Sequence, residues 1–162
     1  MIEFESEALS LKILVTAFDA FDGESTNPAL EAVHRLDTHI GEHVITKLEI
    51  PTVFHESKNV ICKALKEDTY DVVLAIGQAG GRFEITPERV GINIDDARIP
   101  DNKGNQPIDK VIKEDGAPAY FSNLPVKKMV EAIKRAGVPA RLSNTAGTFA
   151  VSYTHLRAHE TV

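Results

Sequence analysis

The sequence contains a single cysteine, no tryptophan and few aromatic residues, which make up 6% of its 162 positions. One thiol, Cys62, excludes an internal disulfide framework and a cysteine-rich metal site. No apolar run approaches the roughly 18 residues that a membrane-spanning helix needs. The formal net charge of −6 disfavours nucleic acids and anionic membranes as main partners. The acidic first ten residues lack the features of a secretory signal, so we expect a soluble, cytoplasmic protein.

The chain is long enough for one domain with a buried core, and its composition is typical of globular proteins. Apolar residues make up 43% of the sequence and charged residues 26%. Short apolar runs alternate with stretches whose apolar residues recur at helical spacing. This alternation predicts a layered α/β fold whose sheet is largely parallel. Strands are expected at residues 11–18, 44–50, 72–77 and 138–142, and helices after Asn27-Pro28, at about residues 54–66, and after a cap at Asn123.

Ligands of open α/β sheets bind at the carboxyl ends of the strands. Four segments of the sequence follow such strand ends, namely residues 18–23, 52–54, 77–82 and 144–149. A further stretch, residues 95–118, is rich in Asp, Asn, Gly and Pro, which disfavour regular structure. Loops of that length in a compact domain are frequently functional. We therefore expect a small-molecule pocket at this edge of the sheet.

Two patterns near these strand ends have both a functional and a structural interpretation. Gly77, Gly80 and Gly81 would either cradle a phosphate or form a tight turn, and their spacing matches neither nucleotide-binding motif, which favours the turn. Glu88 follows a proline and stands beside Arg89, so its carboxylate is either ion-paired or tuned for proton transfer. From the residues alone, the ion pair is the favoured interpretation.

The candidate metal ligands do not form a recognised site, and we expect no metal and no cofactor. The polar cluster in the long loop lacks EF-hand spacing, because Lys103 stands where an oxygen ligand is needed. His155 and His159 have the spacing of a zinc pair, but the glutamate of a zincin is missing. Cys62 lies on the apolar stripe of an expected helix, which indicates an inert thiol. The polar cluster consists of Asp95, Asp96, Asp101 and Asn102.

Several short segments between residues 11 and 149 occur in the same order and with the same spacing as in a known family. The segments are Leu14–Gly23, Asn27-Pro28, Ile50–Phe54, Gly77–Arg82, Ile85–Val90, Ala97–Asn102, Gly116–Phe121, Leu124–Lys128 and Asn144–Phe149. Together they resemble the pyroglutamyl peptidase I family, also called pyrrolidone-carboxylate peptidase. No single segment is decisive, but the ordered set is highly specific.

The resemblance implies a cytoplasmic cysteine peptidase that removes N-terminal pyroglutamate from peptides and uses no cofactor. It also implies a three-layer α/β/α sandwich with a largely parallel, mixed sheet, and assembly as a homotetramer. Catalysis in such a family uses a Cys-His-Glu arrangement, in which the histidine accepts the thiol proton and returns it to the leaving amine. The implied partners are peptides with N-terminal pyroglutamate, and neither nucleic acid nor membrane.

Position by position, the resemblance assigns catalytic roles to Glu88 and Arg98. It also implies a pocket of aromatic and aliphatic walls with a few main-chain hydrogen bonds, which suits an uncharged, planar lactam ring. A charged amino terminus would be rejected there, because burial would leave the charge unpaired. The matching substrate-binding positions are Phe18, Phe21, Thr52, Gln78, Ile99 and Phe149.

The sequence departs from the family pattern after Phe149. Val151 holds the position of the family's nucleophilic cysteine, and neither His155 nor His159 matches the family's histidine, which would come past the last residue. We therefore expect this polypeptide to be inactive as written. The expected division is a leader of no assigned function at residues 1–10, a truncated peptidase domain at residues 11–149, and a tail of read-through or adaptor type at residues 150–162.

Two smaller departures are Ala17 and Asp22, which stand where glycines are commoner in the family and affect the turn after the first strand. The apolar faces and strand edges left uncovered by a truncation predict association or a loosely packed monomer. Two other functions stay open: a non-catalytic protein that binds pyroglutamyl termini, and a small-molecule or phosphate-binding α/β domain that uses Gly77–Gly81.

Overall fold

The computed structural model describes residues 9–149 and builds them around a four-stranded sheet. The strands lie in the order β2-β3-β1-β4, in which β3, β1 and β4 are parallel and β2 is an antiparallel edge strand. The three parallel strands are those that the apolar runs predicted, and the sheet is mixed and largely parallel as expected. The strands are β1 (Lys12–Phe18), β2 (His39–Ile40), β3 (His43–Ile50) and β4 (Val72–Ile76).

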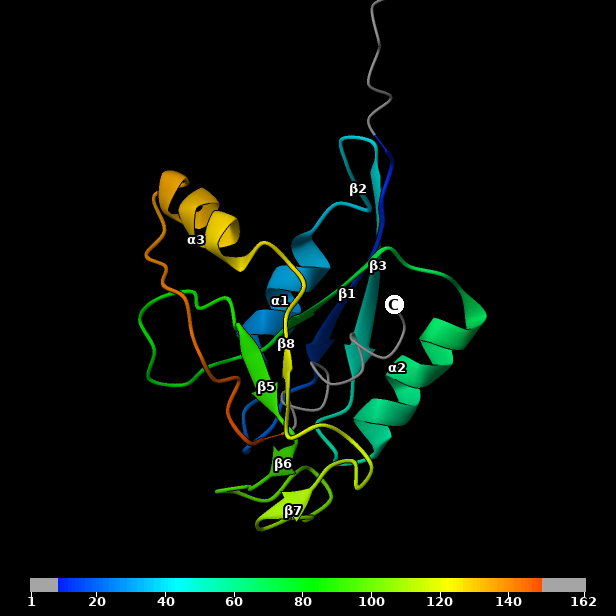
Figure 1. Ribbon diagram of the computed structural model, residues 1–162, viewed down its shortest axis with the longest axis vertical. Helices are drawn as coiled ribbons and strands as arrows, with labels where there is room; N and C mark the ends of the chain where they lie inside the picture. Colours follow the sequence, from blue (N-terminus) through cyan, green and yellow to red (C-terminus); the bar gives the residue numbers. More distant parts are fainter. Residues whose placement is uncertain (1–8, 150–162) are drawn as a thin grey trace, which may run out of the picture.

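Helices α1 (Pro28–Arg35) and α2 (Glu56–Glu67) cover opposite faces of this sheet, which gives the three-layer sandwich (Figure 1). Successive side chains of β1 point to opposite faces, as the pleat requires. Ala17 accordingly packs in the cluster that contains α1, whereas Phe18 packs with Ile61 of α2. Each large side chain buried in this way contributes about 1.5–3 kcal/mol to the stability of the fold.

The starts of these two helices are set by local chemistry. Asn27 caps α1, because its Oδ1 accepts a hydrogen bond of 2.9 Å from the Ala29 backbone N–H, and Pro28 occupies the first turn as the sequence predicts. Helix α2 begins two residues later than expected, at Glu56. The cause is His55, whose φ of 66° is left-handed and incompatible with a right-handed helix.

Helix α3 (Val126–Arg135) corrects the prediction that Asn123 caps the third helix. The residue at the N-cap is Pro125, and no side chain within residues 9–149 caps this helix. A residue that precedes proline is disfavoured in the α region, so the helix begins after Leu124-Pro125 and Asn123 lies too far upstream. Just before the helix, the Leu124 N–H donates a hydrogen bond of 3.2 Å to the Ser122 Oγ.

The strand expected at residues 138–142 is reduced to isolated parallel bridges, which pair Ala140 with Ile85 and Ser143 with Glu88. Pro139 is the reason, because proline has no N–H to donate to a ladder. The Pro139 carbonyl still accepts from the Ile85 N–H at 2.9 Å, so the segment lies alongside residues 85–88. Gly137 lies just before this segment. Its φ of 80° is left-handed, and α3 ends there as expected.

The long polar stretch forms an arm that returns on itself through two short antiparallel pairs. In Figure 1 the β6–β7 pair lies beyond the carboxyl ends of β1 and β3. No helix within residues 9–149 has the length and apolar character needed to cross a membrane. The pairs are β5 (Val90–Ile92) with β8 (Ala119–Phe121), and β6 (Ile94–Asp95) with β7 (Lys110–Val111).

Candidate active site

The carboxyl ends of the parallel strands meet at one edge of the sheet. Phe18 at the end of β1 pairs with Ile50 of β3, and Ala17 pairs with Ile76 of β4. The loops that follow these strands therefore start side by side. This is the edge at which the sequence places its ligand pocket.

Four phenylalanines gather at this edge, and we call Phe18, Phe21, Phe54 and Phe149 the aromatic cluster. The Phe149 ring lies 6.2 Å from the Phe21 ring and 5.3 Å from the Phe54 ring, the latter in an edge-to-face arrangement. Phe18 and Phe54 are buried in one apolar cluster, and Phe149 packs against that cluster. The structure thus brings Phe18, Phe21 and Phe149 together, as the resemblance implied. Phe54 was missed, although it ends one of the matching segments, Ile50–Phe54.

Asp19 joins the loops that carry these rings. Its Oδ1 accepts a hydrogen bond of 2.7 Å from the Thr52 backbone N–H and one of 3.3 Å from the Asn102 side-chain amide. The same amide donates to the Ala20 carbonyl at 2.8 Å, and the Asn102 backbone N–H donates to the Thr52 carbonyl at 3.0 Å. Thr52, a predicted binding residue, is buried in this network with 1% of its surface exposed.

Asp101 fixes the neighbouring loop to the aromatic cluster. Its carboxylate accepts hydrogen bonds of 2.8 Å each from the backbone N–H groups of Phe54, Lys103 and Asn105 and from the Asn105 side chain. Burial raises the pKa of the Asp101 carboxyl, but the hydrogen bonds from Asn105, Phe54 and Lys103 lower it more, so the pKa lies below its usual value. The carboxylate is therefore a loop anchor and not a free metal ligand.

Glu88 lies in the extended segment before β5 and is paired with Arg82. The Arg82 Nη1 donates to Glu88 Oε1 at 2.8 Å and also to Thr86 Oγ1 at 2.8 Å. The second oxygen, Glu88 Oε2, is buried and has no hydrogen-bond partner within the part of the chain that the structure describes. An ion pair was the favoured interpretation of Glu88, and its partner in the structure is Arg82, six positions away.

The remaining predicted residues are more open. Gln78, in the loop after β4, and Arg98, in the loop after β6, are exposed, and Ile99 is half-buried. The Arg98 side chain is exposed and takes part in none of the ion pairs within residues 9–149. Gln78 follows the end of β4 as expected, and Arg98 and Ile99 lie in the long polar stretch, after β6.

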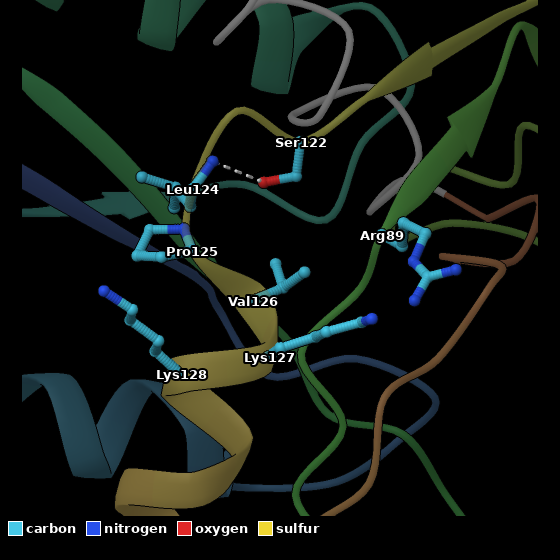
Figure 2. Close-up of a pocket in the computed structure, with 7 residues that line it drawn as sticks. All are labelled: Arg89, Ser122, Leu124, Pro125, Val126, Lys127 and Lys128. Atoms are coloured by element: carbon cyan, nitrogen blue, oxygen red, sulfur yellow. Dashed lines mark hydrogen bonds between the residues drawn. The ribbon is translucent and has the colours of Figure 1, made fainter.

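An open groove lies elsewhere, at the start of α3 (Figure 2). Arg89 from the segment before β5 stands across it from Lys127, and Lys128 lies on the next position of the helix. None of the predicted site residues lines this groove, although Arg89 is adjacent to Glu88 in the chain. The other lining residues are Ser122, Leu124, Pro125 and Val126.

Asp95 is the most unusual carboxylate of the described residues. Only 3% of its surface is exposed, and its Oδ1 has no hydrogen-bond partner within residues 9–149. Burial raises the pKa of Asp95 from 3.8 to about 6. The chain around it contacts the end of the described region, because the next residue, Asp96, donates its N–H to the Thr148 carbonyl at 2.8 Å. No cluster of three or more His, Cys, Asp or Glu side chains within residues 9–149 is arranged to hold a metal ion.

A family model described as pyroglutamyl peptidase matches residues 11–161. The chain belongs to the pyroglutamyl peptidase family. The pyrrolidone-carboxylate peptidase of Staphylococcus haemolyticus is 76% identical over 143 residues, which are 88% of this chain and 68% of that relative. The Staphylococcus aureus peptidase is 60% identical over 144 residues, which are 89% of this chain and 68% of the relative. The chain thus spans about two thirds of the length of these relatives.

Solved structures of pyroglutamyl peptidases have the same fold. The crystal structure of pyroglutamyl peptidase I from Bacillus amyloliquefaciens matches with a TM-score of 0.89 at 46% identity, covering 93% of this chain and 74% of that one. A variant of pyrrolidone carboxyl peptidase from Pyrococcus furiosus matches with a TM-score of 0.89 at 38% identity and the same coverages, 93% and 74%. Both confirm the α/β sandwich that the resemblance implied.

Pyroglutamyl peptidases are cysteine-type hydrolases, so the position of the thiol matters. Cys62 is the only cysteine of the sequence and lies inside α2. That place differs from the one that the resemblance gives to the nucleophile, where a strand end meets the N-terminus of a helix. Val151, His155 and His159 lie outside the described residues.

Proposed function

We propose that this chain binds the N-terminal pyroglutamyl group of peptides at the aromatic cluster, and that the 162-residue polypeptide does not hydrolyse the bond that follows. The observation that carries the proposal is the contact of Phe149 with both Phe21 and Phe54, at 6.2 Å and 5.3 Å. This contact joins three distant segments at the strand edge where α/β ligands bind. Membership of the family supports the ligand class, since the relatives are named pyrrolidone-carboxylate peptidases.

A lactam suits such a cluster for physical reasons. The five-membered ring is flat and uncharged, so aromatic faces can cover it without the cost of burying a charge. Its amide still needs hydrogen-bond partners, and main-chain groups beside Thr52 and the side chain of Gln78 would supply them. Ile99 would close the aliphatic side of the ring. A prolyl terminus has a similar shape but a charged nitrogen, and we expect it to bind far more weakly.

The remaining predicted residues would act on the peptide bond next to the ring. The exposed guanidinium of Arg98 would donate a hydrogen bond to the carbonyl oxygen of that bond, where negative charge develops during attack. The unpartnered Oε2 of Glu88 would accept an N–H donor of the site, while Arg82 keeps the other oxygen in place. Such a carboxylate orients and polarises a reaction but is not itself the nucleophile.

Hydrolysis in this family requires a thiolate, which attacks the carbonyl carbon, and a base that takes the thiol proton. In this chain valine stands at position 151, where the resemblance places the cysteine, and a hydrocarbon side chain cannot form an acyl-enzyme. Cys62 is held within α2 and does not substitute for it. The chain would therefore bind the pyroglutamyl group at the aromatic cluster without cleaving the bond that follows it.

Cleavage is tested with pyroglutamyl 7-amido-4-methylcoumarin, from which a peptidase releases a fluorescent amine. We expect the purified chain to release it no faster than buffer, whereas the Staphylococcus haemolyticus relative serves as the positive control. Release above buffer that disappears in Glu88→Gln would overturn the proposed inactivity.

Binding is tested in parallel by calorimetric titration with L-pyroglutamamide. We expect Phe21→Ala to weaken binding roughly tenfold, because one aromatic wall is lost. The matched control is Phe83→Ala, which removes a ring that is 86% exposed and outside the aromatic cluster. Equal losses in the two variants would contradict the proposed site.

A further inference from the structure

Asp19, Thr52 and Asn102 form a hydrogen-bonded clasp between segments that are far apart in the sequence. Asp19 and Asn102 are 83 positions apart, and the contact between them joins the loop after β1 to the loop after β6. Asp19 Oδ1 holds the Thr52 N–H at 2.7 Å, and the Asn102 N–H holds the Thr52 carbonyl at 3.0 Å. Both the N–H and the carbonyl of Thr52 are therefore held by the clasp.

Each member of the clasp is next to a wall of the proposed lactam site. Asp19 lies between Phe18 and Phe21 in the chain, and the Asn102 amide also holds the Ala20 carbonyl at 2.8 Å, one residue before Phe21. Thr52 is two residues before Phe54. Arg98, with its exposed guanidinium, and Ile99, the aliphatic wall, are four and three residues before Asn102. The clasp thus connects the segments that carry these walls.

The loop that carries Asn102 has a second attachment that does not involve the clasp. Asp101 is 6% exposed and holds the Phe54 N–H at 2.8 Å, and it also accepts three hydrogen bonds from Lys103 and Asn105. The loop therefore stays attached when the exposed Asn102 side chain is removed. Losing the clasp would change the spacing of the walls by a small amount without releasing the loop.

We propose that Asp19 and Asn102 are positioning residues that set the ring-size selectivity of the lactam site. This inference rests on the proposed function, because it takes the aromatic cluster as the place where the lactam binds. Neither residue needs to touch the ligand. With the clasp in place, a five-membered ring would fit between the walls, and a six-membered lactam would add one methylene to the space it needs. Overfilling a packed space is costly, and the cost falls when the walls can move apart.

The test compares two ligands, L-pyroglutamamide and its six-membered homologue 6-oxopiperidine-2-carboxamide, by calorimetric titration of the full chain. We expect the unsubstituted chain to prefer the smaller ring. Asn102→Ala and Asp19→Ala should each reduce the ratio of the two affinities by about threefold to tenfold, because each removes hydrogen bonds of the clasp. The matched control is Asn105→Ala, which weakens the same loop at Asp101 and should leave the ratio unchanged.

The outcomes separate this inference from the proposed function. If the unsubstituted chain binds neither lactam, the proposed lactam site is wrong and the clasp inference falls with it. If the unsubstituted chain prefers the smaller ring and both variants keep the same ratio, the clasp inference alone is overturned. Equal weakening of both ligands, in step with a lower thermal midpoint, would also overturn it, because that result shows only a structural role for the clasp.

Discussion

The buried carboxyl of Asp95 should make the stability of this chain fall as the pH rises from about 4 to about 6. Its pKa is raised by burial from 3.8 to about 6 in the folded chain. Between these values the unfolded chain carries an ionised Asp95 while the folded chain keeps it protonated, so the folded state binds more protons. A shift of about two units corresponds to a loss of roughly 3 kcal/mol, which is complete above about pH 6. That is a large part of the 5–15 kcal/mol of a typical domain.

The perturbation is Asp95→Asn, which removes the titration and keeps the shape. Urea unfolding followed by circular dichroism at pH 4 and pH 7 gives the free energy of unfolding of each protein. From pH 4 to pH 7, we expect the stability of the variant relative to the unsubstituted chain to rise by about 3 kcal/mol. The control is Asp96→Asn, an exposed neighbour for which we expect a change below about 0.5 kcal/mol. The same relative stability of Asp95→Asn at both pH values would refute the reasoning.

Three further predictions concern the loops around the site and the surface. Asp101→Ala should destabilise the chain by about 2–4 kcal/mol, because several backbone donors lose their acceptor, and an unchanged urea midpoint would contradict this. Because the pKa of Asp101 is lowered in the folded chain, the stability that its carboxylate contributes should be lost only as the pH falls below the ordinary carboxyl range. Asp22→Gly should stabilise by about 0.5–1 kcal/mol, because residue 22 has a φ of 57°, whereas Glu24→Gly should not. Phe83→Ser and Phe121→Ser should reduce concentration-dependent association in sedimentation velocity, since these rings are 86% and 65% exposed; unchanged sedimentation would show that they do not mediate it.

The parts of the fold that could be predicted are those with a local signal. Strands β1, β3 and β4 are apolar runs, and Pro51 and Gly77 mark where two of them end. The arm at residues 90–121 could not be predicted in detail, because its two- and three-residue ladders depend on partners elsewhere in the arm. Asn123 was misread as a cap because the effect of Pro125 on the residue before it outweighs the preference of asparagine for caps.

Some residues of the candidate site also have a signal in the sequence, and others have none. Phe21 and Phe149 follow strand ends and match the family pattern, and the structure places them in contact. Phe54 could have been named, since it closes a matching segment. Asp19 could not, because its role is to accept the backbone N–H of Thr52, which is 33 positions away. A contact of that kind leaves no spacing or periodicity in the sequence. The φ of 57° at Asp22 lies in the left-handed region, which favours glycine.

The binding of a neutral lactam at the aromatic cluster is tested most directly by nuclear magnetic resonance. Unlabelled L-pyroglutamamide is titrated into the ¹⁵N-labelled chain, with L-prolinamide as the charged control. We predict saturable shifts of the backbone amides of Phe21, Thr52 and Phe54 with the lactam, and none with prolinamide. Shifts confined to the groove around Arg89 and Lys127, or equal shifts with both ligands, would contradict the account.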